Sequence, residues 1–230
     1  MPEPGRARTA VVAALEREVR PLVKAWHAEE RRHEGRSFQF YKSEGDDVVL
    51  VCGGIGAQAA RRAAEAVIAL YSPAKIYSVG FAGALDPALN IADIIQPEVV
   101  VDAKDGSRTQ IPGGKGTLVT FSAVANPTQK AKLRDSYAAH LVDMEAAAVA
   151  RAAQLCGVEF RAGKAISDEA DFAFPAMERF VTADGQFQQT KFALYAALRP
   201  WLWPKIAHIA RNSSRASAAL YKSLEEILGR

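Results

Sequence analysis

The sequence predicts an α/β fold, in which helices pack against a central sheet. Short runs of β-branched residues, "TAVVAAL", "DVVLVCG" and "KIYSVG", alternate along the chain with Ala-rich segments of helical period. The chain has 230 residues, of which 49% are hydrophobic and 24% are charged, a composition typical of a globular protein with a real core. We therefore expect a single domain of ordinary size.

The first half of the chain is expected to supply several strands and one long helix. The three runs occupy residues 9–15, 47–53 and 75–80, and the segment "ADIIQPEVVV" at 92–101 is also strand-like. Residues 57–71 have the spacing of an amphipathic helix. Its apolar face is formed by Ala60, Ala63, Ala64, Val67, Ile68 and Tyr71, and its polar face carries Arg61, Arg62 and Glu65.

The second half continues the alternation. Asn126 followed by Pro127 is typical of a helix N-cap and first turn, so a helix is expected from there to about residue 137. The segment "HLVDM" is strand-like, and the Ala-rich residues 146–156 predict a helix that Gly157 ends. The segment "VEFRAGKAIS" predicts a further strand over residues 158–167.

Carboxylates follow two of these predicted strands. Asp143 and Glu145 come after "HLV", and Asp168 and Asp171 come after the strand at 158–167. Ligands of open α/β sheets bind outside the carboxyl ends of the strands, so these side chains lie where a site would be. Helix capping and complementation of the helix dipole remain an alternative role for each of them, above all for Asp143 and Asp171.

Composition excludes several classes of protein. A net charge of +3 is too small to indicate a nucleic-acid partner. Cys52 and Cys156 have no CxxC or Cys/His spacing, so neither a disulfide framework nor a zinc site is expected. The apolar run near the N-terminus is too brief for a signal peptide, and no apolar stretch reaches the roughly 18 residues that span a membrane. We expect a cytoplasmic protein.

A glycine-rich turn suggests one alternative function. The segment "VCGGIGAQAA" places Gly54, Gly56 and Ala59 in the G-x-G-x-x-A pattern of dinucleotide-binding proteins. An NAD-dependent oxidoreductase would also need an acidic residue about 20 positions later to hold the ribose, and "SPAKIYSVG" has none. The glycines are better explained by close approach of the backbone to a strand or a small ligand, with the helix N-terminus available to an anion.

Five motifs occur in an order that indicates a family: "AALEREV", "GGIGAQAA", "SVGFAGALDPALNIADII", "VDMEAAAVARAA" and "AISDEAD". With them the chain resembles the nucleoside phosphorylase and methylthioadenosine/S-adenosylhomocysteine nucleosidase superfamily over residues 9–172. The resemblance implies a single three-layer α/β/α domain around a mixed, partly closed sheet, and assembly as a homodimer or larger oligomer. It also implies cleavage of the bond between a purine, with adenine expected, and its ribose, without a metal or organic cofactor.

The resemblance assigns roles to residues within these motifs. Asp168 is similar to the general acid that protonates the departing purine, Glu145 to the group that binds the ribose hydroxyls, and Glu18 to the carboxylate that activates water. Met144 would pack on the sugar, and a position in the hydrophobic core is an equal alternative for it. For Glu18 the alternative is an exposed position on the surface of a helix. Further candidates for substrate contacts are Ser167, Phe81, Ala82 and Gly83.

Two departures from the family pattern leave the nucleophile and the base contacts open. Phosphate-using members carry an Arg before the glycine of the third motif, where this chain has Ser78, and Phe81 stands where nucleosidases keep a small polar residue. Inorganic phosphate therefore remains a co-substrate only if another cation binds it. In the shortened segment "LVTFSAVANPTQ", Phe121, Ser122 and Val124 are candidates for contacts with the base, and core packing is the alternative.

The chain is expected to divide into a phosphorylase-like domain at residues 1–200 and a basic amphipathic tail at 201–230. The tail begins with Trp201 and Trp203 and continues with apolar residues near helical spacing, separated by basic ones. It can pack on the domain, on a second subunit or on an anionic membrane surface, which would make the protein peripheral at the inner membrane. Within the superfamily, the basic tail and the short connection between "ADIIQPEVVV" and "VDMEAAAV" most resemble the hopanoid-associated phosphorylase branch, whose substrates carry a lipid. A catalytically inactive nucleoside-binding or membrane-docking protein on the same fold is the competing hypothesis.

Overall fold

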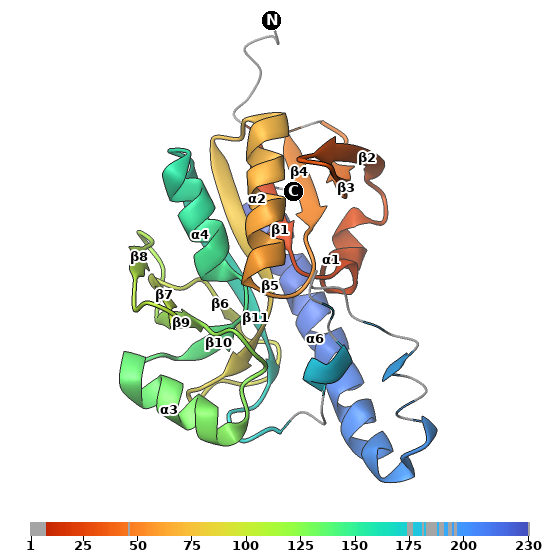
Figure 1. The fold of residues 1–230 in the computed structure, drawn as a ribbon, viewed down its shortest axis with the longest axis vertical. Coiled ribbons are helices and arrows are strands. Elements are labelled where there is room, and N and C mark those ends of the chain that lie inside the picture. Colours follow the sequence, from red (N-terminus) through yellow and green to blue (C-terminus); the bar gives the residue numbers. More distant parts are fainter. Residues whose placement is uncertain are drawn as a thin grey trace, which may run out of the picture.

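The structure, a computed structural model, describes residues 8–45, 47–173, 177–180, 182, 188, 191–192, 195 and 197–229. Its central feature is a mixed sheet (Figure 1). The described strands are β1 (Thr9–Ala13), β2 (His27–His33), β3 (Arg36–Lys42), β4 (Val48–Cys52), β5 (Lys75–Ala84), β6 (Ile94–Ile95), β7 (Val99–Asp102), β8 (Arg108–Gln110), β9 (Thr117–Thr120), β10 (Leu141–Asp143) and β11 (Glu159–Asp168).

The long strand β5 joins the two halves of the sheet. The strand order is β2-β3-β4-β1-β5-β10-β9-β7-β8, and β11 pairs with β5 and with β6. β1 runs parallel to the first half of β5, β10 runs antiparallel to its last residues, and β11 runs parallel to it over nearly its whole length. Because β5 has three partners, the sheet branches and curls there. The predicted mixed, partly closed sheet is confirmed.

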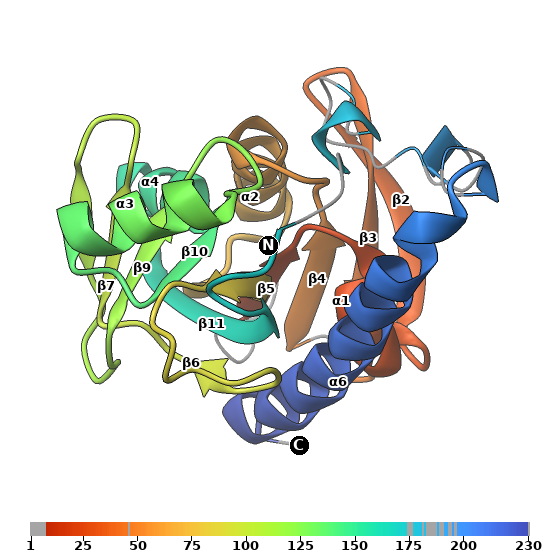
Figure 2. The ribbon, with the colours of Figure 1, turned by 90° about the horizontal axis from the view of Figure 1, so that it is seen from below.

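Helices cover both faces of the sheet. The described α-helices are α1 (Glu16–Val23), α2 (Ala57–Tyr71), α3 (Pro127–Tyr137), α4 (Ala146–Leu155) and α6 (Trp203–Ile227), and short 3₁₀ turns occupy Met177–Phe180 and Pro200–Leu202. α2 and α4 pack on one face, whereas α1 and α6 pack on the other (Figure 2). Within β1, Val12 packs toward the first pair and Val11 toward the second, as the alternation of a strand requires.

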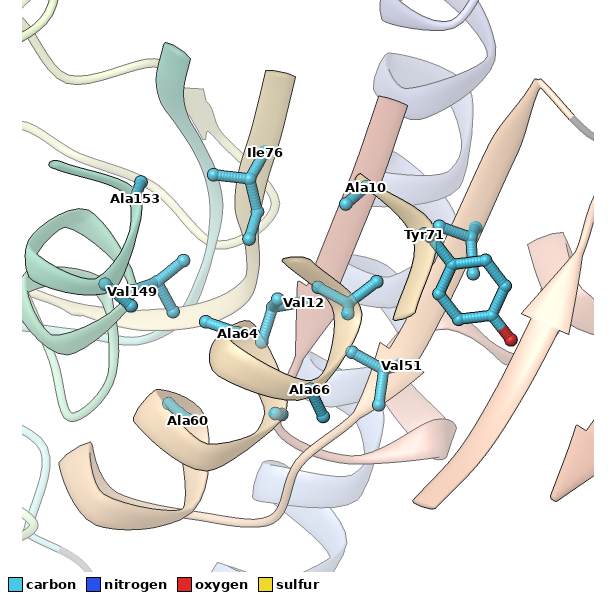
Figure 3. Packing of buried hydrophobic residues seen from close by; sticks show 14 of the residues in the cluster. Ala10, Val12, Val51, Ala60, Ala64, Ala66, Tyr71, Ile76, Val149 and Ala153 are labelled. Atoms are coloured by element: carbon cyan, nitrogen blue, oxygen red, sulfur yellow. The ribbon is translucent and has the colours of Figure 1, made fainter. Parts of the chain in front are cut away.

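The core under α2 and α4 is built of small side chains. Ala60 and Ala64 of α2, Val149 and Ala153 of α4, and Ile76 of β5 belong to one cluster of buried residues (Figure 3). Small residues let the two helices approach each other and the sheet closely, and they leave little room for substitution. The helix predicted at 57–71 has these bounds, and its expected apolar face is the buried one.

Two segments differ from what the sequence predicts. The segment at 92–101, expected as one strand, divides into β6 and β7 around Pro97, which lacks the N–H that a continuous ladder needs. The hairpin of β2 and β3 was not predicted, because β2 has no buried face.

The tail, whose apolar residues have near-helical spacing, forms the 25-residue helix α6. Its Ala216, Leu220 and Leu224 pack against α1 and the sheet, which is one of the positions expected for the tail.

Within the described residues, no helix combines the length and apolar character that crossing a membrane requires. Residues 1–7, the segment that precedes the first strand, lie outside the described residues.

Candidate active site

A cavity of about 160 Å³ opens where β1, β5, β10 and β11 end. Most of the candidate residues line it: Glu18, Phe81, Ala82, Gly83, Val124, Met144, Glu145, Ser167 and Asp168. Phe121 is not among the described lining residues and packs instead beside the apolar cluster around Val119 and Val142. Ser122 is also absent from that described wall, and Asp171 is exposed. The motifs therefore converge on one place although they are far apart in the sequence.

Glu18 enters the cavity from the first turn of α1 and is buried, not a surface helix residue. Burial raises the pKa of its carboxyl from the ordinary 4.5 to about 7, although Lys164 and Arg17 oppose this shift. Gly80 makes the room for it, because a Cβ at that position would come within 2.6 Å of Glu18 Oε2. Gly80 also has φ +140°, a conformation that favours glycine. A carboxyl that titrates near neutral pH suits a general base.

Glu145 lies between β10 and α4 and is held by two backbone groups. The N–H of Gly56 donates to Oε1 at 2.7 Å, and the N–H of Met144 donates to Oε2 at 3.1 Å. Burial and the nearby Asp143 raise the pKa of Glu145 to about 7, while Lys164 opposes them. The glycine-rich turn thus uses Gly56, at the N-terminus of α2, to orient a carboxylate of the same chain. This contact removes the main support for the NAD interpretation.

Asp143 caps α4 and also pairs with a buried lysine. Its Oδ2 accepts the N–H of Ala146 at 2.9 Å and lies 2.9 Å from Lys164 Nζ, while Oδ1 accepts the Thr120 hydroxyl at 2.7 Å. Lys164 Nζ further donates to Ser78 Oγ at 3.2 Å. Burial alone would lower the pKa of Lys164, but the carboxylates around it, first Asp143 and then Glu145, raise it. Lys164 is therefore a fixed positive charge behind the acidic wall.

Asp168 ends β11 and also has a cationic partner. Lys130 Nζ lies 2.5 Å from Asp168 Oδ2, and the Ser167 hydroxyl donates to Oδ1 at 2.9 Å. Gly83 provides the space, because a Cβ there would lie 2.7 Å from Oδ2. The structure thus places a buried ammonium directly against this acid.

The sequence interpretation missed both lysines. Lys130 lies in a helix whose other residues are mostly polar, and Lys164 is the single charge in the apolar run "AGKAIS". A lysine inside the apolar end of a predicted strand was the available signal for Lys164, since a buried charge needs a partner. No comparable signal marked Lys130.

The cavity thus combines a carboxyl that can act as base near neutral pH, a second carboxyl aimed by backbone N–H groups, and a third paired with a lysine. Among the residues that the structure describes, no three His, Cys, Asp or Glu side chains are grouped so as to hold a metal ion. The arrangement suits acid–base cleavage of a bond whose transition state gains positive charge.

Solved structures of other proteins share the fold of this chain. The 5′-methylthioadenosine nucleosidase of Arabidopsis thaliana aligns with a TM-score of 0.74 and 21% identity, over 98% of this chain and 96% of that one. A methylthioadenosine/S-adenosylhomocysteine nucleosidase from Neisseria meningitidis, in complex with methylthio-immucillin-A, aligns with a TM-score of 0.71 and 19% identity, over 96% and 98% of the two chains.

The sequence comparisons identify the family. The model of the phosphorylase superfamily matches residues 8–128 and 103–197, so the chain belongs to that superfamily. A 5′-methylthioadenosine/S-adenosylhomocysteine nucleosidase of Bacillus thuringiensis (strain Al Hakam) is 29% identical over 197 residues, which cover 70% of this chain and 85% of the relative. The predicted superfamily and class of enzyme, a nucleoside phosphorylase or nucleosidase, are confirmed.

Proposed function

We propose that this protein hydrolyses the N-glycosidic bond of an adenine nucleoside. The observation that carries the proposal is the convergence of Glu18, Glu145 and Asp168 on one cavity. The names of the relatives, which are nucleosidases, support the same reaction. Cleavage of this bond leaves positive charge on the ribose and negative charge on the purine, so the site needs carboxylates at the sugar and an acid at the base.

Each carboxyl has a place in this reaction. Glu145, fixed by Gly56 and Met144, accepts hydrogen bonds from the ribose hydroxyls and stabilises the cation beside them. Asp168 gives a proton to the departing purine. Glu18 takes a proton from the attacking water, which requires its ionised form, so kcat/KM rises with pH as Glu18 titrates near pH 7. The nucleoside would lie against an apolar wall of the cavity, which is formed by Met144, Phe81 and Val124.

Water is the favoured nucleophile because the cations of the wall are already engaged. Lys130 is paired with Asp168, and Lys164, which contacts Ser78 where phosphate-using relatives have Arg, is bound to Asp143. Arg17 also lines the cavity and has a partner of its own. Phosphorolysis remains the second candidate, with Arg17 as the cation that phosphate would need.

A second, larger cavity supports a proposal about the size and polarity of the 5′ substituent of the substrate. It measures about 950 Å³, lies between α1 and α6, and shares Arg17, Phe81, Ile209 and Ser213 with the catalytic cavity. Ile206, Ile209 and Ala210 give it an apolar wall, and Arg20 and Lys24 add positive charge. This volume supports a bulky, mainly apolar 5′ group, such as the lipid of the hopanoid-associated branch.

The experiment is a chromatographic assay of free base released from adenosine, methylthioadenosine, S-adenosylhomocysteine, inosine and a 5′-alkyl adenosine. Each substrate is incubated with and without phosphate. We expect adenine from the alkyl compound at equal rates in both conditions. Release that depends on phosphate would establish the phosphorylase reaction, and intact nucleosides in every sample would favour the binding protein.

A membrane contact is proposed for the first turns of α6. Leu198, Trp201 and Trp203 are large apolar residues with 69%, 70% and 56% of their surface exposed, and Arg199 and Lys205 lie among them. Figure 1 shows this end of α6 at the lower edge of the molecule. Apolar and basic side chains together suit an anionic lipid surface at the cytoplasmic face of the membrane.

Vesicle sedimentation tests this contact. The protein should sediment with vesicles that contain phosphatidylglycerol and less with vesicles of phosphatidylcholine alone, and the double variant Trp201→Ser with Trp203→Ser should lose the difference. Equal sedimentation of the wild type with both kinds of vesicle would reject the proposal.

Assembly as a homodimer or larger oligomer is proposed from the family resemblance. Light scattering tests it.

A further inference from the structure

Lys130 is a buried cation for which the reaction described above has no role. Its side chain has 2% of its surface exposed and lies in the wall of the catalytic cavity. Nζ is 2.5 Å from Asp168 Oδ2 and donates to the Glu169 carbonyl at 2.5 Å. Two of its three hydrogens are therefore directed to the end of β11.

The helix that carries Lys130 is built to hold it there. α3 begins with a reciprocal cap, in which Asn126 accepts the N–H of Gln129 and the Gln129 side chain accepts the N–H of Asn126. Pro127 fixes the first turn, and Leu133, one turn beyond Lys130, is the other buried residue of the helix. The helix thus uses one of its two buried positions for a charge.

Stability does not explain this choice. A buried ion pair must overcome the desolvation of both ions, and apolar residues of the same volume commonly stabilise a protein as well or better. One member of the pair, Asp168, is the group that must exchange a proton in the proposed reaction.

We propose that Lys130 is a positioning residue that stabilises the carboxylate formed when Asp168 gives its proton to the leaving purine. The proposal rests on the hydrolysis described above. In that step the O–H bond of Asp168 breaks, an N–H bond forms on the purine, and the electron pair of the glycosidic bond goes to the base. The new negative charge lies against the ammonium of Lys130. Glu18 later releases to solvent the proton taken from water, and Asp168 takes one back.

Other ionisable groups surround the pair and must be controlled. Glu18 and Arg17 of α1 and Asp143 and Glu145 line the same cavity, and Lys164 pairs with Asp143. On the outer side, the Glu169 carboxylate lies 3.3 Å from His208 of α6. A background that lacks the Asp168 carboxyl separates the effect of Lys130 on Asp168 from effects through these groups.

The test measures kcat and KM for the wild type and for Lys130→Met, Lys130→Arg and the matched control Lys132→Met, whose lysine is exposed on the same helix. We expect Lys130→Met to lower kcat by about tenfold or more and to leave KM nearly unchanged, because the new charge on Asp168 forms only as the base departs. Lys130→Arg should keep most of kcat, because it keeps the charge, and Lys132→Met should change neither constant.

The decisive measurement repeats Lys130→Met in an Asp168→Asn background, where it should change kcat by less than about twofold. Equal losses in both backgrounds would overturn the proposal and leave a structural role. If the Met variant does not fold, Lys130→Gln carries the same prediction. Absence of base release by the wild type would instead reject the proposed function.

Discussion

At the scale of single residues, the site depends on how each carboxyl is surrounded. Glu18 is desolvated, Glu145 accepts two backbone N–H groups, and Asp168 contacts an ammonium. The three carboxyls therefore have different contacts within one cavity, and these contacts fit them for different roles in acid–base catalysis. The sequence motifs identified the three carboxyls, but they did not indicate the cations that distinguish them.

Asp168→Asn should leave the protein folded and lower kcat by at least about a hundredfold, the scale of a lost general acid. The amide cannot supply the proton, although it can still accept a hydrogen bond from Lys130. Base release measures the rate, and circular dichroism measures the fold. Near-normal turnover in a folded variant would remove Asp168 from the mechanism.

Gly80→Ala should greatly reduce kcat/KM, because the new Cβ would lie 2.6 Å from Glu18 Oε2 and the residue would keep a φ of +140°. Gly163→Ala is the control: it lies in the neighbouring strand β11, and a Cβ there meets no atom within 4 Å. Steady-state kinetics of both variants checks the prediction. Equal activity of the two alanine variants would show that Glu18 does not depend on this space.

At the scale of secondary structure, α6 supports the helix that carries the expected base. Leu220 and Leu224 of α6 pack with Val19 and Leu22 of α1, and the Ser217 hydroxyl donates to the Glu18 carbonyl at 3.1 Å. The C-terminal helix is therefore part of the scaffold of the active site, in addition to lining the larger cavity.

Leu220→Ala should lower the free energy of unfolding by about 2–5 kcal/mol, the cost of truncating a fully buried leucine. The exposed Lys222→Ala on the same helix should change it by less than about 0.5 kcal/mol. Urea unfolding of both variants measures these differences. A small effect of Leu220→Ala would mean that α6 is only loosely held against α1.

The sequence predicted the regular elements of the second half well, because their signals are local. The Asn126–Pro127 start gives α3, and Gly157 follows α4 closely. The hairpin of β2 and β3 was missed because its first strand, β2, has polar residues on both of its sides and therefore no alternation to detect. The ion pairs of Lys130 and Lys164 depend on tertiary contacts between distant segments, which neither periodicity nor capping residues encode.

At the scale of the whole molecule, the acidic site makes stability depend on pH. Glu18 and Glu145 titrate near pH 7 in the folded protein and near 4.5 when unfolded. Below about pH 4.5 both carboxyls are protonated in the folded and in the unfolded protein. Between pH 4.5 and 7 the unfolded chain loses these protons, whereas the folded protein keeps them. This contribution to stability is therefore lost as the pH rises through 7.

Glu18→Gln should accordingly stabilise the protein at pH 8 by about 1–3 kcal/mol relative to the wild type and have little effect at pH 4.5. The amide resembles the protonated carboxyl and has no charge to desolvate. Thermal unfolding at both pH values measures the difference. A variant that is destabilised equally at both would show that the charge of Glu18 is already compensated in the fold.

The three partners of β5 also affect how the protein folds. Glu18 follows β1, Glu145 follows β10 and Asp168 ends β11, and each of these strands must pair with β5 before its carboxyl reaches the cavity. Contacts between segments so distant in the sequence are slow to form, because a long loop must close for each. During refolding, the recovery of activity should therefore lag behind the recovery of helical signal, and no nascent chain that ends before β11 can turn over substrate.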